Sequence, residues 1–159
     1  MTETNKLIKL EEILQSQQAD YTFLKDSVNF KTSEEGAAHY GVSMSETTPT
    51  LILKSKDKFF AAIICGDTKI VFKKLKQALG VKDLSMADPE TVHQLTGAHV
   101  GYVSMINEGL PTVIDNQVLN NEKCFGGCGV RDVSLQINTR DLINITDARL
   151  FDFAELKSN

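Results

Sequence analysis

Two apolar, β-prone runs that lie close together in the sequence constrain the fold of this chain most. Residues 49–54 (PTLILK) and 58–65 (KFFAAIIC) are separated by the polar residues Ser-Lys-Asp. Runs of this kind, joined by a short polar turn, predict a β-hairpin. Both are far shorter than the roughly 20 apolar residues that span a bilayer, so we expect the hairpin in a soluble protein.

Helices are predicted on both sides of this hairpin. Residues 5–17 carry leucine and isoleucine at spacings of three and four, which predicts an amphipathic helix, and a short strand is expected around 21–24. Thr32 and Glu35 form a capping-box pattern that opens the helix SEEGAAHY, and Gly41 ends it.

The second half of the chain mixes both kinds of element. The apolar face of DTKIVFKKLKQALG predicts a helix that ends at Gly80, and Asp88-Pro89-Glu90 starts a helix that stops at Gly97. A long loop at 98–111 follows. Three further strands are expected in PTVID, KCF and VSLQI, then a helix from Asn138 and a last helix in DARLFDFAEL. This order predicts one mixed α/β domain over residues 1–159, arranged around a sheet.

Composition narrows the function. The net charge of −4 argues against a protein that binds along duplex DNA, although a local basic patch could still bind the end of an RNA. The odd number of cysteines (three) favours a reducing compartment. The first twelve residues lack an apolar core of signal-peptide length, so we expect a cytoplasmic protein. Cys124 and Cys128 have no second ligand pair, so we expect no zinc site, and nothing in the sequence requires a cofactor.

Several pieces, in order, resemble the YbaK/ProX/EbsC family, which also supplies the inserted editing domain of bacterial prolyl-tRNA synthetases. They span residues 32–142 and are TSEEGAAHYGVS, TLILK with FFAAIICGD, FKKLKQALGVKDLSMADPETVHQLTG, GLPTVID, and GGCG with VSLQINTRDL. The resemblance implies a curled mixed β-sheet flanked by helices. It also implies hydrolysis of the ester that joins a wrong amino acid to the terminal ribose of a tRNA, typically a tRNA for proline or cysteine carrying a small amino acid.

The lysine that this family places before Thr-Leu in its first central strand is absent, because Pro49 precedes Thr50-Leu51 here. Thr50 remains a candidate for substrate binding. Lys54 is the nearest substitute for the catalytic lysine, but side chains alternate along a strand, so it should point away from the side of position 49 unless a bulge intervenes. Its alternative role is a solvent-facing charge.

A loop glycine is the second implied feature. Gly101-Tyr102-Val103-Ser104-Met105 resembles the Gly-x-x-x-Pro loop that shapes the amino-acid pocket of the family, with Met105 in place of the proline. Backbone amides beside Gly101 could hold an ester carbonyl or its oxyanion, which makes this glycine a catalytic candidate. Tyr102, Ser104 and Met105 would line the pocket. His99 could act as a base or simply be exposed.

The third feature is the run Gly126-Gly127-Cys128-Gly129, which lines the site in the family. Gly127, Cys128 and Gly129 are therefore candidate substrate-binding residues. The glycines could instead form a β-bulge or admit another backbone. Arg131 could meet a phosphate or be an ordinary surface arginine.

These features favour a stand-alone deacylase that binds the acceptor end of an aminoacyl-tRNA, and possible partners include an aminoacyl-tRNA synthetase. The replacements at Pro49 and Met105 leave open a non-catalytic module that binds an amino acid, an aminoacyl-adenosine or a synthetase. A third alternative is a hydrolase of another small activated ester that uses Cys128 or His99.

Overall fold

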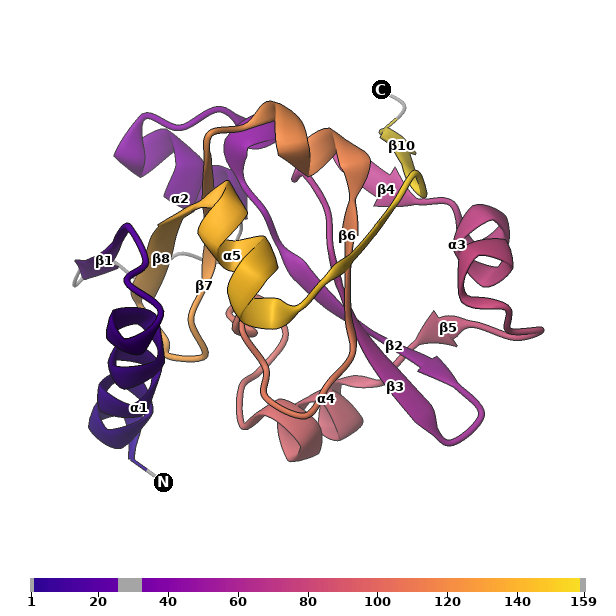
Figure 1. Ribbon diagram of the computed structural model, residues 1–159, viewed down its shortest axis with the longest axis horizontal. Helices are drawn as coiled ribbons and strands as arrows, with labels where there is room; N and C mark the ends of the chain where they lie inside the picture. The colour runs from indigo at the N-terminus through magenta and orange to yellow at the C-terminus, as the bar shows by residue number, and fades with distance from the viewer. Residues whose placement is uncertain (1, 26–32, 158–159) are drawn as a thin grey trace.

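Helices and strands alternate along residues 2–25 and 33–157, the part of the chain that this computed structural model describes (Figure 1). The α-helices are α1 (Glu3–Ser16), α2 (Ser33–Tyr40), α3 (Phe72–Leu79), α4 (Pro89–Thr96) and α5 (Thr139–Thr146). Two 3-10 helices cover Met44–Glu46 (η1) and Asn116–Asn120 (η2). The strands are β1 (Tyr21–Lys25), β2 (Thr50–Ser55), β3 (Lys58–Ile63), β4 (Thr68–Ile70), β5 (Ser85–Met86), β6 (Thr112–Asp115), β7 (Lys123–Gly127), β8 (Val133–Asn138), β9 (Arg149–Phe151) and β10 (Ala154–Leu156).

The largest sheet is mixed. Its strand order is β5-β2-β3-β6-β9, with antiparallel pairing on the β2 side and parallel pairing from β3 to β9. A second, antiparallel sheet has the order β1-β8-β7, and β4 pairs with β10. The expected class, a mixed α/β fold with helices around a mixed sheet, is confirmed, but the strands of the described residues divide among more than one sheet.

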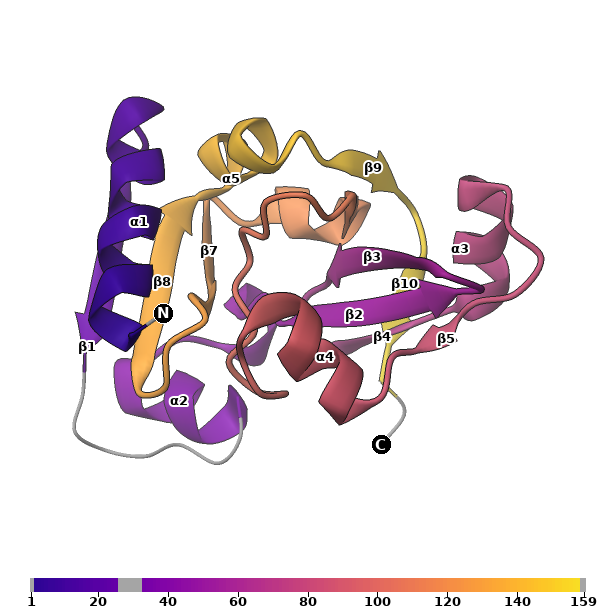
Figure 2. The same ribbon diagram turned by 90° about the horizontal axis from the view of Figure 1, so that it is seen from below.

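Side chains of the central hairpin alternate between two cores. Leu53 and Ala62 pack with α3 and Phe153 on one face of the large sheet. Ile52 and Ala61 pack with α4 and the loop after it on the other face. Farther along that face, Ile63 joins the core shared with α1, α5 and the three-stranded sheet. Both views place α3 and α1 at opposite ends of the molecule, with α4 between them (Figures 1 and 2).

The predicted helix boundaries are confirmed where capping residues define them. Asp88 accepts a hydrogen bond from Thr91 N at 2.8 Å, Pro89 is the first residue of α4, and Gly97 ends the helix at φ +75°. Asn138 caps α5 in the same way through Asp141 N at 3.1 Å. The capping box expected at Thr32 lies outside the described residues, whereas Gly41 follows α2 at φ +68° as expected.

The helix predicted in DARLFDFAEL is wrong, because this segment forms β9 and β10. The Asp115 carboxylate accepts hydrogen bonds from the amides of Phe153 at 2.8 Å and Ala154 at 2.9 Å, which fixes the chain between the two strands. β9 pairs with β6 and β10 pairs with β4, so partners distant in sequence override the local helical pattern. For the same reason Thr68–Ile70 is a strand, and α3 begins only at Phe72.

Helices in the described ranges are all too short or too polar to cross a lipid bilayer.

Candidate functional site

The loop between α4 and β6 lies against the end of the β7–β8 hairpin, and this contact forms the candidate site. Gly129 N donates to Tyr102 O at 2.9 Å, and Met105 N donates to Gly127 O at 3.1 Å. The structure thus brings together two of the three segments that the sequence singled out. The third, residues 48–50, reaches the same place because Thr48 N donates to Phe125 O at 2.8 Å.

Glycines at the end of β7 allow this close approach. A Cβ atom on Gly127 would collide with the Val103 carbonyl oxygen and come within 2.9 Å of the Tyr102 carbonyl carbon. One on Gly126 would lie 2.6 Å from Thr48 O and 2.8 Å from Met105 Sδ. Both glycines keep the regular register with β8, so they mark contact with another backbone and form no bulge.

Gly101 is a glycine for a different reason. Its φ of +112° is rarely adopted by residues with a side chain, yet no atom lies within 4 Å of where its Cβ would be. The backbone therefore turns sharply at an exposed position directly before Tyr102. Such a turn leaves room for a ligand to approach the main chain.

Ser104 and Met105 shape the loop from within. The Ser104 hydroxyl accepts from Ile106 N at 3.1 Å, and the Ser104 carbonyl accepts from the Asn107 side-chain amide at 2.6 Å. Met105 is fully buried, and the Thr48 hydroxyl donates to its Sδ at 3.2 Å. Met105 thus forms the wall behind Gly126 and is not exposed to a substrate, contrary to the expectation that its side chain lines the pocket.

Thr50 carries a buried hydroxyl without a hydrogen-bond partner among the described residues. It lies on the same face of β2 as Ile52, which packs with Val103 of the loop. An unsatisfied buried hydroxyl costs about 1–3 kcal/mol. A bound molecule could satisfy this hydroxyl only if the residues that cover it shifted slightly.

Lys54 lies at the far end of β2 from Thr50. Four residue-to-residue steps along the extended strand separate their Cα atoms, which is about 13 Å. Lys54 is exposed and pairs with Phe59 and Ser85 across the sheet. Hydrogen bonds from Thr91 and, to a smaller extent, the charge of Lys54 hold the pKa of Asp88 below its usual value. The structure thus places Lys54 beside the start of α4 and does not bring it to the Gly101 loop.

The Cys128 thiol is buried in the main core, where it donates to Val133 O at 3.4 Å. Burial raises the pKa of Cys128 to about 11, so the reactive thiolate is scarce at neutral pH. Burial in the core and this raised pKa argue against a role for the Cys128 side chain as substrate contact or nucleophile. Cys65 and Cys124 are also buried free thiols with raised pKa values.

A series of ring contacts lies near Gly101, and no pattern in the sequence predicts it. His93 on α4 stacks on His99 at 4.4 Å with nearly parallel planes (4°). His99 meets Tyr102 edge to face at 6.0 Å, and the Arg131 guanidinium lies 5.7 Å from the Tyr102 ring centre. We call these four residues the ring cluster. His93 and His99 stand six residues apart on either side of the αL residue Gly97, so helical spacing could not pair them.

Helix α1 braces both sides of this region. Lys6 Nζ donates to Gly97 O at 2.7 Å, at the end of α4. Glu3 Oε2 accepts from Arg131 N at 3.1 Å, in the β7–β8 turn. Two side chains one helical turn apart thus hold the two segments that meet at the site.

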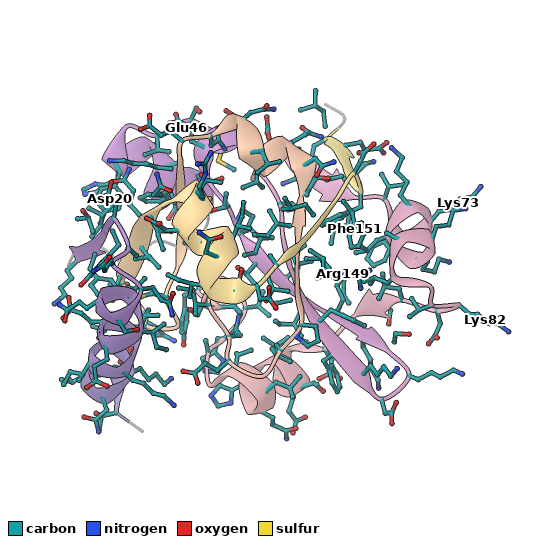
Figure 3. All side chains as sticks on the ribbon, in the orientation of Figure 1. Asp20, Glu46, Lys73, Lys82, Arg149 and Phe151 are labelled. Carbon is teal, nitrogen blue, oxygen red and sulfur yellow. The ribbon has the colours of Figure 1, made fainter. Side chains whose placement is uncertain are left out.

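Other charged or hollow parts of the described surface lie elsewhere. Lys73 on α3 and Lys82 in the loop after it point outward at the end of the molecule opposite α1 (Figure 3). The Arg149 guanidinium lies 4.8 Å from the centre of the Phe151 ring. A shallow hollow of about 320 Å³ lies beside Gly109 and Pro111, not at Gly101. No group of three or more histidine, cysteine or acidic side chains in the described ranges is placed to hold a metal ion.

This combination of a mixed α/β fold with a loop held against a glycine-rich strand end belongs to a known class of domain. Residues 28–145 match the aminoacyl-tRNA editing domain family. The match covers most of the chain, so the chain belongs to this family. The resemblance seen in the sequence is confirmed.

Curated relatives include bacterial proline–tRNA ligases. The one from Caldicellulosiruptor bescii is 29% identical over 130 residues, which cover 82% of this chain and 22% of the ligase. The one from Desulforamulus reducens is 34% identical over 106 residues, which cover 66% of this chain and 19% of the ligase. The chain therefore corresponds to about a fifth of the length of these ligases.

Solved structures agree on the fold. The hypothetical protein APE2540 aligns with a TM-score of 0.86 and 30% identity, covering 92% of this chain and 99% of that one. A second structure, described as "a putative trans-editing enzyme for prolyl tRNA synthetase", aligns with a TM-score of 0.81 and 20% identity over 98% and 99% of the two chains. At that identity the second likeness concerns the fold alone.

Proposed function

We propose that this protein is an aminoacyl-tRNA deacylase that hydrolyses the ester of mischarged tRNA at the Gly101 loop. The observation that carries the proposal is the sharp, exposed turn at Gly101, held against the glycines of β7 in a chain of the editing-domain family. The expected substrates are tRNAs for proline or cysteine that carry a wrong small amino acid. The family relation to proline–tRNA ligases supports this choice.

Backbone donors would supply the main catalytic effect. Tyr102 N already donates to His99 O and Met105 N to Gly127 O. The amides of Gly101, Val103 and Ser104 have no partner within residues 2–25 and 33–157, so they are candidate donors to the ester oxygen. An aminoacyl ester is already activated, so positioning it against water and stabilising the developing oxyanion lowers the barrier without a nucleophilic side chain. The ribose hydroxyl next to the ester could assist the attack.

Thr50 would complete the site. Its buried hydroxyl lacks a partner in the described residues, and a hydroxyl can donate one hydrogen bond and accept others. In the proposed complex it holds the attacking water or the free ribose hydroxyl. Binding of substrate would then satisfy a group that is costly to leave alone.

A non-catalytic binding module remains the competing proposal. It is favoured by Pro49 at the position of the family lysine and by the placement of Lys54 at the far end of β2. In that case the same loop would bind an amino acid, an aminoacyl-adenosine or a synthetase surface without turnover. Ligands of this kind would raise the unfolding temperature, because they bind only the folded state.

The test is a deacylation assay of the purified protein on a panel of mischarged tRNAs, with a Gly101→Ala variant and Gly109→Ala as the matched control. Both glycines lie in the same loop at positive φ (+112° and +82°), and neither has an atom near its Cβ position. Alanine is strained at both positions, and more so at Gly101, whose φ lies farther from the left-handed region, so the unfolding temperature of each variant is measured beside its rate. We expect Gly101→Ala to reduce the rate at least tenfold and Gly109→Ala to leave it nearly unchanged.

Thr50→Val gives a second, independent test. Valine has nearly the same shape and removes a hydroxyl that has no partner in the described part of the chain, so we expect unchanged or slightly raised stability together with a lower deacylation rate. Equal deacylation rates for Thr50→Val and the parent protein would show that the Thr50 hydroxyl takes no part in the reaction. No deacylation of any substrate in the panel would overturn the proposed activity, and a thermal shift without turnover would support the binding module.

A further inference from the structure

Thr48 lies where the three segments of the candidate site meet, just before β2. Its side chain is fully buried. Its main-chain N donates to Phe125 O of β7 at 2.8 Å, and its hydroxyl donates to Met105 Sδ of the loop at 3.2 Å. Two residues further on, the chain reaches Thr50 at the start of β2. Thr48 therefore connects the strand end, the loop and the strand that carries the Thr50 hydroxyl.

The loop is also held against β7 through its main chain. Tyr102 O accepts from Gly129 N at 2.9 Å, beside the ring cluster, and Met105 N donates to Gly127 O at 3.1 Å. Both hydrogen bonds fix the loop relative to the strand end. Neither of them fixes the loop relative to β2, where the rest of the proposed site lies.

Contacts between the loop and the β2 side are of two kinds. Val103 belongs to the same apolar cluster as Ile52 of β2, and packing of this kind has no preferred direction. The hydrogen bond from the Thr48 hydroxyl to Met105 Sδ is directional, and it lies where the chain enters β2. This bond can therefore define where the loop lies relative to β2.

The Met105 side chain requires a fixed partner if it is to define a position. A methionine has three rotatable bonds and adapts to cavities of several shapes. Here the side chain is fully buried, and its Sδ and Cγ lie 2.8 and 3.1 Å from where a Cβ atom on Gly126 would be. The Thr48 hydroxyl bonds the same sulfur. Because the thioether is held in this place, the main chain that carries it is held as well.

We propose that Thr48 is a positioning residue for the reaction at the Gly101 loop. Its hydroxyl, acting through Met105, sets the distance between the main-chain donors of residues 101–104 and the hydroxyl of Thr50. Thr48 itself does not touch the substrate, because its side chain is fully buried and its hydroxyl proton is already bonded to sulfur. This inference rests on the proposed function, since it assigns those amides to the ester oxygen.

Positioning of this kind acts on the chemical step and not on binding. Misplaced donors stabilise the developing oxyanion less, while the rest of the substrate binds as before. Thr48→Val keeps the shape of the side chain and removes the hydroxyl. We expect this variant to lower kcat about two- to tenfold, the loss that one hydrogen bond corresponds to, and to leave KM nearly unchanged.

Hydrogen exchange measures the position of the loop without any substrate. The amides of Tyr102, Met105 and Ile106 are hydrogen-bonded, so their exchange reports on opening of the loop. We expect about two- to tenfold faster exchange of these amides in Thr48→Val and in Met105→Leu, which replaces the thioether with a side chain of similar volume. The double variant should exchange no faster than either single variant, because both changes remove the same bond.

Two further variants are matched controls. Thr48→Ser keeps the hydroxyl, so its exchange and kcat should resemble those of the parent. Thr47 is the preceding residue and is also buried, but its hydroxyl donates to Met44 O at 2.8 Å in η1 and not to the loop. We expect Thr47→Val to lower the unfolding temperature and to leave kcat and the exchange of the loop amides unchanged. Stability and loop position are thus measured separately.

The outcomes distinguish this role from the activity itself. Faster exchange in Thr48→Val and Met105→Leu, with the parent's exchange in both controls, supports the positioning of the loop by Thr48 even if no mischarged tRNA is hydrolysed. Unchanged exchange in Thr48→Val, or additive effects in the double variant, overturns it even if the parent is an active deacylase. In an active protein, a raised KM with unchanged kcat also overturns it. Should Thr48→Val fail to fold, Met105→Leu decides by the same criteria.

Discussion

Gly127 and Gly101 belong to the two segments that meet at the candidate site, yet they are glycines for opposite reasons. At Gly127 the backbone is regular, and the constraint is space, because the Val103 carbonyl occupies the place of a side chain. At Gly101 the space is open, and the constraint is a positive φ. Gly127 is therefore needed for the packing of the domain, and Gly101 for the shape of an exposed loop. A substitution at Gly127 should mainly lower stability, and one at Gly101 should mainly lower activity.

The largest effect is expected for Gly127→Ala. The added methyl group meets main-chain atoms of residues 102 and 103, which cannot move aside without breaking the contact between the loop and β7. We expect a loss of about 3 kcal/mol in the free energy of unfolding, at the upper end of the range for overpacking. Urea unfolding measures it, and a loss below that of Gly101→Ala would contradict the distinction between the two glycines.

A smaller effect is expected from alkaline pH through Cys128, which follows the same strand. Burial raises the pKa of its thiol from the ordinary value of 9.0 to about 11 in the folded state. The folded protein therefore favours the neutral thiol, so this stabilisation is complete below pH 9 and is lost as the pH rises through about 11. Between pH 9 and about pH 11, the parent should lose about 2 kcal/mol more of its free energy of unfolding than the Cys128→Ala variant does. Parallel pH profiles of unfolding would contradict the burial of this thiol.

Gly101→Ala should cost less stability than Gly127→Ala. An alanine forced to positive φ loses about 1–2 kcal/mol, and no neighbouring atom adds to it. Its effect on deacylation should exceed its effect on stability, while Gly109→Ala shares only the stability loss. If Gly101→Ala and Gly109→Ala lowered the deacylation rate equally, the turn at Gly101 would have no special role in the reaction.

The smallest effect is expected at the brace from α1. Lys6→Met removes the hydrogen bond to Gly97 O but keeps the length and apolar stem of the side chain, so we expect about 0.5–1.5 kcal/mol of lost stability. Lys9→Met, at an exposed position of the same helix, is the control. Hydrogen exchange of the 97–105 amides should increase in the Lys6 variant and not in the control. Equal exchange in both would show that α1 does not hold the loop.

Local signals in the sequence were sufficient for most elements. The caps at Asp88, Asn138 and Gly80 act through hydrogen bonds and backbone conformations within a few residues, so they are visible in the sequence. The C-terminal segment was mispredicted because its partners lie more than thirty residues away. Asp115 Oδ1 is bonded to the amides of Phe153 and Ala154, and no local pattern reveals that contact.

For the candidate site, the sequence by itself determined the segments: the Gly101 loop, the glycine run after β7 and the strand that begins at Thr50. These segments contain glycines that the backbone conformation requires. The resemblance to the family, which follows the same order along the chain, was therefore sufficient to find them. Tertiary structure alone decided which side chains face the site. It buried Met105 and Cys128, left the Thr50 hydroxyl without a partner among the residues that the structure describes, kept Lys54 away and joined His93 to Arg131 through ring contacts. The exposure and the contacts of a side chain depend on how segments far apart in the sequence pack together. The spacing of residues along the chain does not reveal that packing.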